Sequence, residues 1–294
     1  MLRHELRIAQ SIFDFCLILE AAMIRAVFFD LDGTLLDSKK KIPESAKAAL
    51  RRCREKGVRV YIATARSPRL DQTLGWTQEE FALFDGCIYS NGACMMLDGT
   101  PQYRFIDPRA VRACVEKAAA FEGLHLSLHM ANEEYAFNFP VVESMYQSWG
   151  LANARICALD EEAMKRTTKM LLFYDHLTDS QRKLPEEAVE TIRSCCGALA
   201  KVYMSDEGRT LQVSGSEAGK LAAIEQTRKQ MGWSVQEVAV FGDDVNDLEM
   251  IGFYPNSVAM GNAAQQVKAA AGSVTRTNDE GGIAYALERL LSNE

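Results

Sequence analysis

The chain has 294 residues, of which 48% are apolar and 25% charged, and its net charge is −7. These values are typical of a globular protein with one large domain or two of ordinary size. The acidic balance disfavours nucleic acid and anionic membranes as partners. Because the eight cysteines include no C-x-x-C pair and no zinc-type spacing, we expect reduced thiols in the cytoplasm.

Residues 1–22 form a separate segment. The apolar run from 8 to 24 is interrupted by Asp14 and Glu20, which disfavours a secretory signal or a membrane-spanning helix. The run contains neither Gly nor Pro, so we expect it to be helical. We interpret the segment as an N-terminal extension or an added packing helix, with the working protein beginning near Met23.

From residue 24 short apolar runs alternate with helical stretches, a pattern typical of βαβ units and a parallel sheet. The first part predicts strands at 24–29, 58–63 and 87–90, a helix at 43–56, and a hairpin at 93–105 that turns at Asp98-Gly99.

The alternation stops after residue 108. The sequence then predicts helices at 109–121 and 185–196, two alternating strands in HLSLHM and EYAFNF, and further strands at 169–174 and around AKVYM and TLQVS. Mixed strands and helices of this kind predict an inserted α+β domain over 104–209.

The βα pattern resumes toward the C-terminus. Strands are predicted at 239–242, 258–260 and 273–275, and helices at 218–231, 245–251, 263–270 and 281–291. The predicted fold class is therefore α/β: a Rossmann-like, doubly wound parallel-sheet core at 23–103 and 210–294, interrupted by the α+β domain.

Polar side chains follow the predicted core strands. Asp30, Thr64 and Asp243 come directly after three of them, and Ser90 and Asn91 end a fourth. Because ligands bind beyond the carboxyl ends of the strands in open parallel sheets, we expect these residues to meet at one edge. Together they suit an oxygen-coordinated cation and a phosphate.

The first strand end reads DLDGTLLD (30–37). Asp30 and Asp32 are two residues apart and point the same way in an extended chain. Two close carboxylates favour a bound cation or protonation of one of them. Gly33 permits a sharp turn. A calcium loop would need its glycine at the sixth position, where this chain has Leu35.

The last strand end reads GDDVND (242–247). Asn246 and Asp247 fall in the first turn of the next predicted helix, where backbone N–H groups favour anions. In isolation this pattern is equally typical of an ordinary helix cap.

DLDGT, ATAR (63–66), Lys220 and GDDVND, in this order and spacing, closely resemble the four motifs of the haloacid dehalogenase-like (HAD) hydrolases. DLDGTLLDSKKKI, CIYSNGA, FGDDVNDLEMI and VAMGNAAQQVKAAAGSVT further resemble the Cof-type phosphatase branch, subclass IIB. That branch carries a large α/β cap after its second motif. The resemblance runs from Met23 to the C-terminus and is weaker in the cap.

The resemblance implies an aspartyl-phosphate mechanism. Asp30 would attack the phosphorus. Asp32 would protonate the leaving oxygen and then deprotonate water, which requires a raised pKa that the neighbouring carboxylate helps to supply. Mg²⁺ would be held by Asp30, the backbone carbonyl of Asp32, and Asp243, while Asp244 and Asp247 would orient the waters bound to the metal.

The same resemblance implies the phosphate contacts. Thr64 and the backbone N–H groups of Ala65 and Leu31 would bind phosphoryl oxygens, and Lys220 would balance their charge. Asn246 would touch the phosphate or position its helix. At the start of a predicted helix, Lys220 could instead be a solvated surface charge.

The chain departs from the family pattern at two glycines. Ala65 and Leu221 stand where the branch commonly has glycine, and a methyl group at 65 requires a negative φ. Arg66 is expected to be structural or to lie at the rim. Six cap residues could contact the leaving group, although ordinary surface or strand-pairing polarity is the favoured explanation for each of them: His125, His129, Asn132, Tyr135, Asn138 and Arg209.

The expected function is Mg²⁺-dependent hydrolysis of a small phosphorylated metabolite, either a sugar phosphate or a cofactor-type phosphate. A phosphosugar mutase or phosphotransferase with the same nucleophile is the alternative. A binding protein that has lost catalysis is disfavoured because the acidic residues and the lysine are intact. A dehalogenase is disfavoured because that chemistry needs neither the second aspartate nor a metal.

Overall fold

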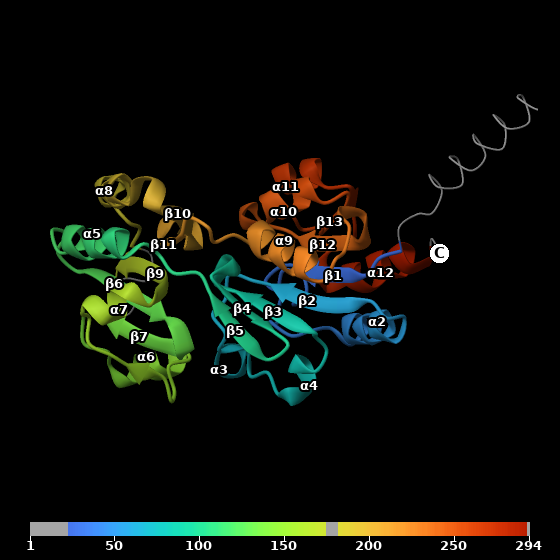
Figure 1. The fold of residues 1–294 in the computed structure, drawn as a ribbon, viewed down its shortest axis with the longest axis horizontal. Helices are drawn as coiled ribbons and strands as arrows, with labels where there is room; N and C mark the ends of the chain where they lie inside the picture. The colour runs from blue at the N-terminus through green and yellow to red at the C-terminus, as the bar shows by residue number, and fades with distance from the viewer. Residues whose placement is uncertain (1–22, 175–181, 293–294) are drawn as a thin grey trace, which may run out of the picture. The chain divides into compact units, whose positions relative to one another are not determined.

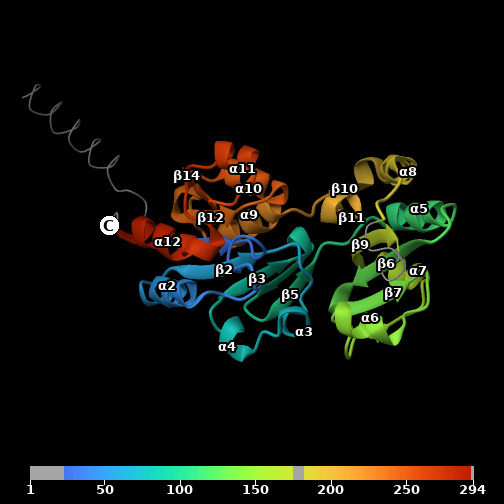
Figure 2. The same cartoon turned by 180° about the vertical axis from the view of Figure 1, so that it is seen from behind.

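The computed structural model describes residues 23–174 and 182–292. The chain divides into two compact units, one made of Met1–Tyr61 and Thr227–Glu294 and the other of Ile62–Gln226. Figures 1 and 2 show the labelled helices and strands from opposite sides. The helix predicted before Met23, and Cys16 within it, lie outside the described residues. Within the described part, no helix is long and apolar enough to cross a membrane.

The first unit contains a parallel sheet in the order β14-β13-β12-β1. All its neighbouring strands run parallel, and Phe29 aligns with Phe241. The side chains of β1 and β12 are buried, as expected for a sheet covered on both faces. The strands are β1 (Ala26–Phe29), β12 (Val238–Gly242), β13 (Asn256–Ala259) and β14 (Ser273–Val274). The α/β class with a parallel core sheet is confirmed.

Helices cover this sheet. Helix α2 (Glu44–Glu55) packs against α12 (Gly282–Ser292), and α10 (Leu248–Phe253) packs against α11 (Gln265–Ala270). The buried residues of α2 follow helical spacing and form one face: Ala46, Ala49, Leu50 and Cys53. Burial of that face, more than helix propensity, stabilises such a short helix.

Strand β2 (Arg59–Ala63) runs from the first unit into the second. There β3 (Gly86–Tyr89), β4 (Cys94–Leu97) and β5 (Thr100–Tyr103) pair antiparallel. The turn between β4 and β5 has φ of 48° at Asp98 and 74° at Gly99, so the predicted hairpin is confirmed. Two short helices, α3 (Leu70–Leu74) and α4 (Gln78–Phe81), were not predicted.

The second unit also contains a six-stranded sheet in the order β10-β11-β9-β6-β7-β8. Its pairs are antiparallel except β7 with β8. The strands are β6 (Leu124–Met130), β7 (Glu134–Phe137), β8 (Arg155–Ile156), β9 (Thr167–Tyr174), β10 (Ala200–Ser205) and β11 (Thr210–Gly215). That the α+β domain begins at 104 and ends at 209 stays a prediction.

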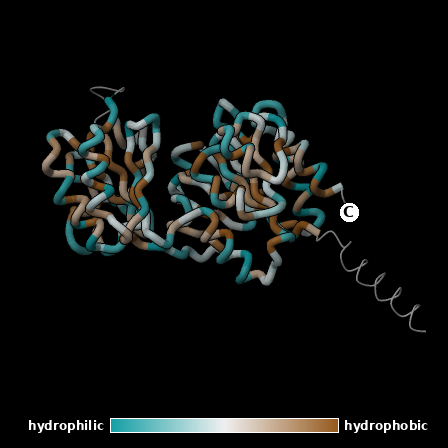
Figure 3. Tube along the Cα trace, turned by 90° about the horizontal axis from the view of Figure 1, so that it is seen from above, coloured by the Kyte–Doolittle hydropathy of each residue, from teal (hydrophilic) through white to brown (hydrophobic). Residues whose placement is uncertain are grey.

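Helices pack on one face of this sheet. Helix α5 (Pro108–Ala118) lies against α8 (Glu186–Cys196), and their apolar side chains share one core with Leu126, Leu128 and Leu172. The remaining helices are α6 (Glu143–Ser148), α7 (Glu161–Lys165) and α9 (Lys220–Gln230). Figure 3 shows hydrophobic segments inside each unit and hydrophilic ones on the outer loops.

The other face of the sheet differs in character. Alternation along β6 and β9 sends every second side chain there, and the register pairs His129 with Lys169 and Ser127 with Leu171. Polar and aromatic residues therefore share the face opposite to the helix-covered core.

A strained loop follows β3. Ser90, Asn91 and Gly92 have φ of 50°, 51° and 86°. A Cβ atom at Gly92 would lie 2.3 Å from the carbonyl oxygen of Gly219, directly before α9. Glycine is therefore required at position 92 both by its backbone conformation and by the available space.

This close approach predicts the effect of a substitution. We expect Gly92→Ala to lower the free energy of unfolding by roughly 3 kcal/mol or more, because a left-handed backbone and a backbone clash act together. Gly57→Ala is the matched control, since Gly57 has φ of 78° but no atom within 4 Å of the added Cβ. Gly57→Ala should lower the free energy of unfolding by about 1–2 kcal/mol. Urea unfolding of both variants measures the difference, and equal losses would contradict a clash.

Candidate active site

The first unit brings three carboxylates together. Asp30 follows β1, Asp243 follows β12, and Asp247 lies one turn later; one carboxylate oxygen of each lies within 4.8 Å of those of the other two. Asp30 and Asp247 are buried. Like charges at this distance favour a cation or a shared proton. Carboxylate oxygens are the donors that a hard divalent cation such as Mg²⁺ prefers, so the cluster fits that ion.

Backbone hydrogen bonds hold Asp247 in place. Its Oδ2 accepts the N–H groups of Asp243 (3.0 Å) and Asp244 (3.2 Å), while Asp244 Oδ1 accepts the N–H of Val245 (2.7 Å). The sequence left open whether GDDVND caps a helix or forms a site. The structure shows a capping turn, and the same turn carries Asp247 into the acidic cluster, whereas the sequence had suggested only a supporting position.

Thr34 supports the cluster through a contact that the sequence analysis missed. Its side chain is fully buried, and Oγ1 donates to Oδ1 of Asp243 at 2.7 Å. Gly33 has φ of 81°, and a Cβ there would lie 2.2 Å from Asp243 Oδ2. Asn262 Nδ2 donates to the Gly33 carbonyl at 2.8 Å. The threonine of DLDGT was visible as a hydroxyl four residues after Asp30, but its partner is distant in sequence.

Asp32 forms an ion pair with a lysine. Lys40 Nζ lies 2.8 Å from Asp32 Oδ1, and 37% of the Asp32 side chain is exposed. Lys40 has φ of 60° in a turn held by Asp37, whose Oδ1 accepts the N–H groups of Lys39 and Lys41. A neighbouring cation favours the ionised carboxylate, which opposes the protonated form that a general acid needs.

In the second unit, Thr64 follows β2 and is buried. Its N–H donates to the Ile88 carbonyl at 2.8 Å, its carbonyl accepts the Asn91 N–H at 2.9 Å, and its Oγ1 accepts the Arg66 N–H at 3.1 Å. Ala65 is not among the described residues with positive φ, so its methyl group is accommodated. The ATAR segment is thus fixed against the strained loop after β3.

Lys169 lies beside that segment, and the sequence analysis missed it. It is 8% exposed, and Nζ donates to the Ala65 carbonyl at 3.1 Å. Burial, helped by the Arg66 charge, lowers the pKa of Lys169 to about 8. A charged residue at the start of an otherwise apolar strand was the available signal.

His129 is the neutral neighbour of this lysine. Burial, with Lys169 nearby, lowers the pKa of His129 to about 3, so the imidazole carries no charge near neutral pH. Nδ1 lies 3.2 Å from Ser67 Oγ, and Nε2 lies 3.3 Å from Ser127 Oγ. The ring therefore serves as a hydrogen-bonding group between two hydroxyls.

Aromatic side chains form a pocket beside His129. Its volume is about 280 Å³, and the Trp149 and Phe173 ring centroids lie 4.9 Å apart in its wall. Of the cap candidates, only His129 and Tyr135 are among the described lining residues, which are His129, Tyr135, Phe137, Trp149, Leu151, Leu171, Phe173 and Thr210.

The other cap candidates make ordinary contacts. Asn138 bonds both the N–H of Leu126 and the carbonyl of Leu124, as strand-pairing polarity would. Arg209 pairs with Asp206. The remaining two contact aromatic residues: the His125 ring lies against Phe139 and Phe173, and the backbone N–H of Asn132 donates to the Tyr103 hydroxyl.

Lys220 begins α9 and is 3% exposed. Such burial excludes the alternative of a solvated surface charge. Leu31 is also buried, whereas Asp244 and Asn246 are exposed. Whether Thr64, Ala65 and Lys220 share a phosphate with the acidic cluster stays a prediction.

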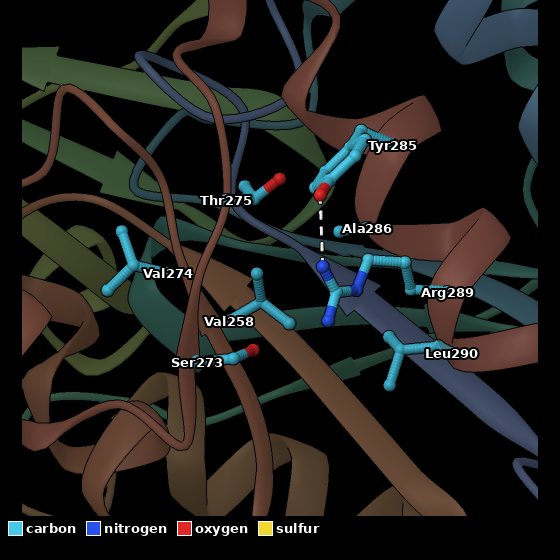
Figure 4. A pocket seen from close by; sticks show the side chains of 8 residues that line it. All are labelled: Val258, Ser273, Val274, Thr275, Tyr285, Ala286, Arg289 and Leu290. Carbon is cyan, nitrogen blue, oxygen red and sulfur yellow. Dashed lines mark hydrogen bonds between the residues drawn. The ribbon is translucent and has the colours of Figure 1, made fainter. Parts of the chain in front are cut away.

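A separate cavity of about 250 Å³ lies in the first unit, beside the edge strand β14. Figure 4 shows its lining from β13, β14 and α12, with Arg289 Nη1 donating to the Tyr285 hydroxyl at 2.9 Å. The guanidinium carbon of Arg276 lies 4.2 Å from the centroid of the same Tyr285 ring. None of the described residues that line this cavity is a carboxylate, so the cavity is distinct from the acidic cluster.

The fold and motifs place the chain in a known enzyme class. The family model of the haloacid dehalogenase-like hydrolases matches residues 27–287. The chain belongs to this family, as the sequence motifs predicted. Its predicted nature as a hydrolytic enzyme is thereby confirmed.

Curated relatives and solved structures cover almost the same length. An HMP-PP phosphatase of Klebsiella pneumoniae is 28% identical, over 84% of this chain and 88% of that protein. A haloacid dehalogenase-like hydrolase of Bacteroides thetaiotaomicron superposes with a TM-score of 0.74 at 25% identity, covering 91% and 99%. The HAD subclass IIB sugar phosphatase BT4131 superposes with a TM-score of 0.73 at 25% sequence identity, and the match covers 90% of this chain and 98% of that one.

The buried charge of Lys169 predicts a pH-dependent stability effect. Its folded-state pKa of about 8 lies below the ordinary 10.5, so charge burial costs up to about 3 kcal/mol below pH 8. Between these values the unfolded chain binds more protons, and the cost disappears as pH rises. We expect Lys169→Met to unfold at a higher temperature than the wild type at pH 7, with a gap that closes toward pH 10.5.

The control is Lys201→Met. Lys201 lies in the same sheet and also donates to a backbone carbonyl, that of Ala218, at 2.7 Å. Thermal unfolding from pH 7 to 10.5 should show a changing gap only for Lys169→Met. A constant gap for both variants would contradict a depressed pKa at Lys169.

Proposed function

We propose that the protein is a Mg²⁺-dependent phosphatase that hydrolyses a small phosphorylated metabolite through an aspartyl phosphate on Asp30. The observation that carries this proposal is the meeting of Asp30, Asp243 and Asp247 beyond parallel strands. Family membership and the phosphatase names of similar proteins support the same reaction. The substrate class is a sugar phosphate or a cofactor-type phosphate.

The reaction has two halves. A carboxylate oxygen of Asp30 attacks the phosphorus in line, so that a new P–O bond forms while the bond to the leaving oxygen breaks. Asp32 donates a proton to that oxygen. Water then attacks the phosphorus and gives its proton to Asp32, the bond to Asp30 breaks, and inorganic phosphate leaves.

Asp30, Asp243 and the backbone carbonyl of Asp32 would hold Mg²⁺, and the position of Asp247 makes it a further candidate ligand. Asp244 would orient water bound to the metal. The ion supplies positive charge that lets one anion approach another. Thr34 keeps one oxygen of Asp243 fixed, which sets the direction of the other.

The phosphate would be bound by residues of the segments that resemble the family's motifs. Thr64 and the N–H groups of Ala65 and Leu31 would donate to phosphoryl oxygens, and Lys220 would balance their charge. Asn246 is exposed at the capping turn and would reach the phosphate from there.

Lys40 and Asp30 both influence the protonation of Asp32, which has to act first as an acid and then as a base. The ion pair stabilises the carboxylate form, which is the form that accepts a proton from water in the second half. For the first half Asp32 must be protonated, and the negative charge of Asp30 two residues away favours that form. We propose that these two neighbours balance the acid and base roles.

The leaving group would lie against the cap. A pocket of about 280 Å³ with aromatic walls and a neutral His129 fits a small ring that presents one apolar face and a few hydroxyl or amide groups. We propose that residues 104–209 form this cap on a core of 23–103 and 210–294. The free thiols among the described cysteines suit a reducing cytoplasm, with neither nucleic acid nor membrane as a partner.

Phosphoenzyme trapping tests the nucleophile. Asp30→Asn should lower phosphate release by about 10⁴-fold or more and form no phosphoenzyme, because an amide cannot make the new P–O bond. Asp32→Asn should accumulate phosphoenzyme, since water is no longer deprotonated. Acid-quenched mass spectrometry with a panel of phosphorylated sugars and cofactors measures both.

Three outcomes would contradict the proposal or part of it. Turnover by Asp30→Asn at the wild-type rate would exclude the nucleophile. Phosphoenzyme on a different residue would exclude the assignment of Asp30. Transfer of phosphate to a second sugar hydroxyl without release of inorganic phosphate would identify the protein as a phosphosugar mutase instead.

Metal dependence tests the acidic cluster. EDTA should abolish turnover and Mg²⁺ should restore it. Thr34→Val should raise the Mg²⁺ concentration needed for half-maximal activity by about 10- to 100-fold, because Asp243 loses the hydrogen bond that orients it. Thr34→Ser keeps the hydroxyl and is the matched control. Activity that is unaffected by EDTA would rule out the metal.

A further inference from the structure

Three thiols converge on the helix-covered side of the six-stranded sheet. Cys114 lies on α5, and Cys195 and Cys196 end α8. Sγ of Cys114 lies 3.4 Å from Sγ of Cys196 and 3.8 Å from Sγ of Cys195, and all three sulfurs lie within 4.8 Å of one another. The proposed phosphatase reaction uses none of them.

The sulfur positions match a centre that binds three sulfurs. Bonds of about 2.3 Å to one central atom place the sulfurs roughly 3.5–4.0 Å apart, whether the centre is pyramidal or trigonal. The separations of 3.4 and 3.8 Å from Cys114 are close to that spacing, and the third separation, between Cys195 and Cys196, is no more than 4.8 Å.

The net charge of the bound complex decides which kind of central atom suits the three thiols. Cys114 and Cys196 are buried in the apolar core, and Cys195 packs against it. In the described part of the chain no His, Asp or Glu joins this group of three. Three thiolates around a divalent ion would leave a net negative charge in apolar surroundings, which is costly. Three thiolates around a trivalent centre are neutral.

We infer that Cys114, Cys195 and Cys196 form a binding site for a trivalent thiophilic metalloid of the arsenite type. The reaction is As(OH)₃ + 3 RSH → As(SR)₃ + 3 H₂O. Three As–O bonds break, three As–S bonds form, and each thiol proton leaves in a water molecule. No oxidant or reductant is needed, since arsenic stays trivalent.

The structure also offers an entry point. Cys195 is partly exposed and lines an open groove with Lys117, Glu190 and Ser194. The first As–S bond therefore forms at Cys195, and the two buried thiols displace the remaining oxygens in turn. The bound atom would join α5 to α8 and stabilise their packing.

The test uses the full chain, reduced and freed of metal. It is incubated with arsenite and desalted, and the retained arsenic is measured by elemental analysis and intact mass. We expect one arsenic per chain, a mass increase of one arsenic less three hydrogens, and a raised unfolding temperature. Cys114→Ser, Cys195→Ser and Cys196→Ser should each weaken retention by roughly 10²-fold, because an intramolecular third bond is lost.

Cys157→Ser is the matched control, since Cys157 is a partly exposed thiol outside the group of three. Circular dichroism checks that each variant folds, and Cys195→Ser is decisive because this side chain is the least buried of the three. Retention that is lost equally in Cys157→Ser, or kept in Cys195→Ser, would overturn the site. A tightly held zinc ion that arsenite does not displace would overturn the choice of a trivalent centre. None of these readouts depends on phosphatase activity.

Discussion

Repulsion between carboxylates is the constraint that organises the first unit. Asp30, Asp243 and Asp247 have oxygens within 4.8 Å of one another, although two of them are buried where water screens little. Asp243 accepts a hydrogen bond from the Thr34 hydroxyl, and Asp247 accepts two from backbone N–H groups. These donors stabilise the charges without removing them. The cluster therefore keeps a strong preference for a cation, which is what binding of a hard divalent ion requires.

The second unit buries a positive charge. Lys169 is a buried cation beside Arg66, and its ammonium group is held by the carbonyl of Ala65. Neutral His129 lies alongside, between two serine hydroxyls. A buried cation next to a segment expected to bind phosphate raises the local positive potential in a chain whose net charge is −7.

The success of the sequence analysis follows from topology. Parallel strands that each end in a polar residue deliver those residues to one edge, so β1 and β12 position Asp30 and Asp243 side by side. The hairpin at Asp98-Gly99 and the long helices were likewise predictable, because turn chemistry and the helical period are local. Five-residue helices such as α3 and α7 have too few turns to show a period.

The missed residues share one physical cause. Thr34 and Asp243 are 209 positions apart, and Lys169 and Ala65 are 104 apart, so neither contact leaves a local pattern. Asp247 was expected to support the acidic cluster rather than to join it, because a regular helix was expected from residue 245. The chain instead makes a tighter turn at Val245–Asp247 before α10. That turn directs the Asp247 side chain back to the end of β12, where its oxygen meets two backbone donors.

The two clusters of like side chains, one of carboxylates and one of thiols, are therefore stabilised in different ways. Two of the three aspartates are buried and all three lie close together, so their cluster favours hydrogen-bond donors and a cation. The thiol of Cys114 remains neutral when nothing is bound, because its hydrogen bond with Cys196 and its burial raise its pKa. A neutral thiol costs the core little, and the three sulfurs become a ligand set only when a centre arrives that replaces their protons. A site of that kind can persist within the apolar core of the second unit without the backbone hydrogen bonds that fix the acidic cluster.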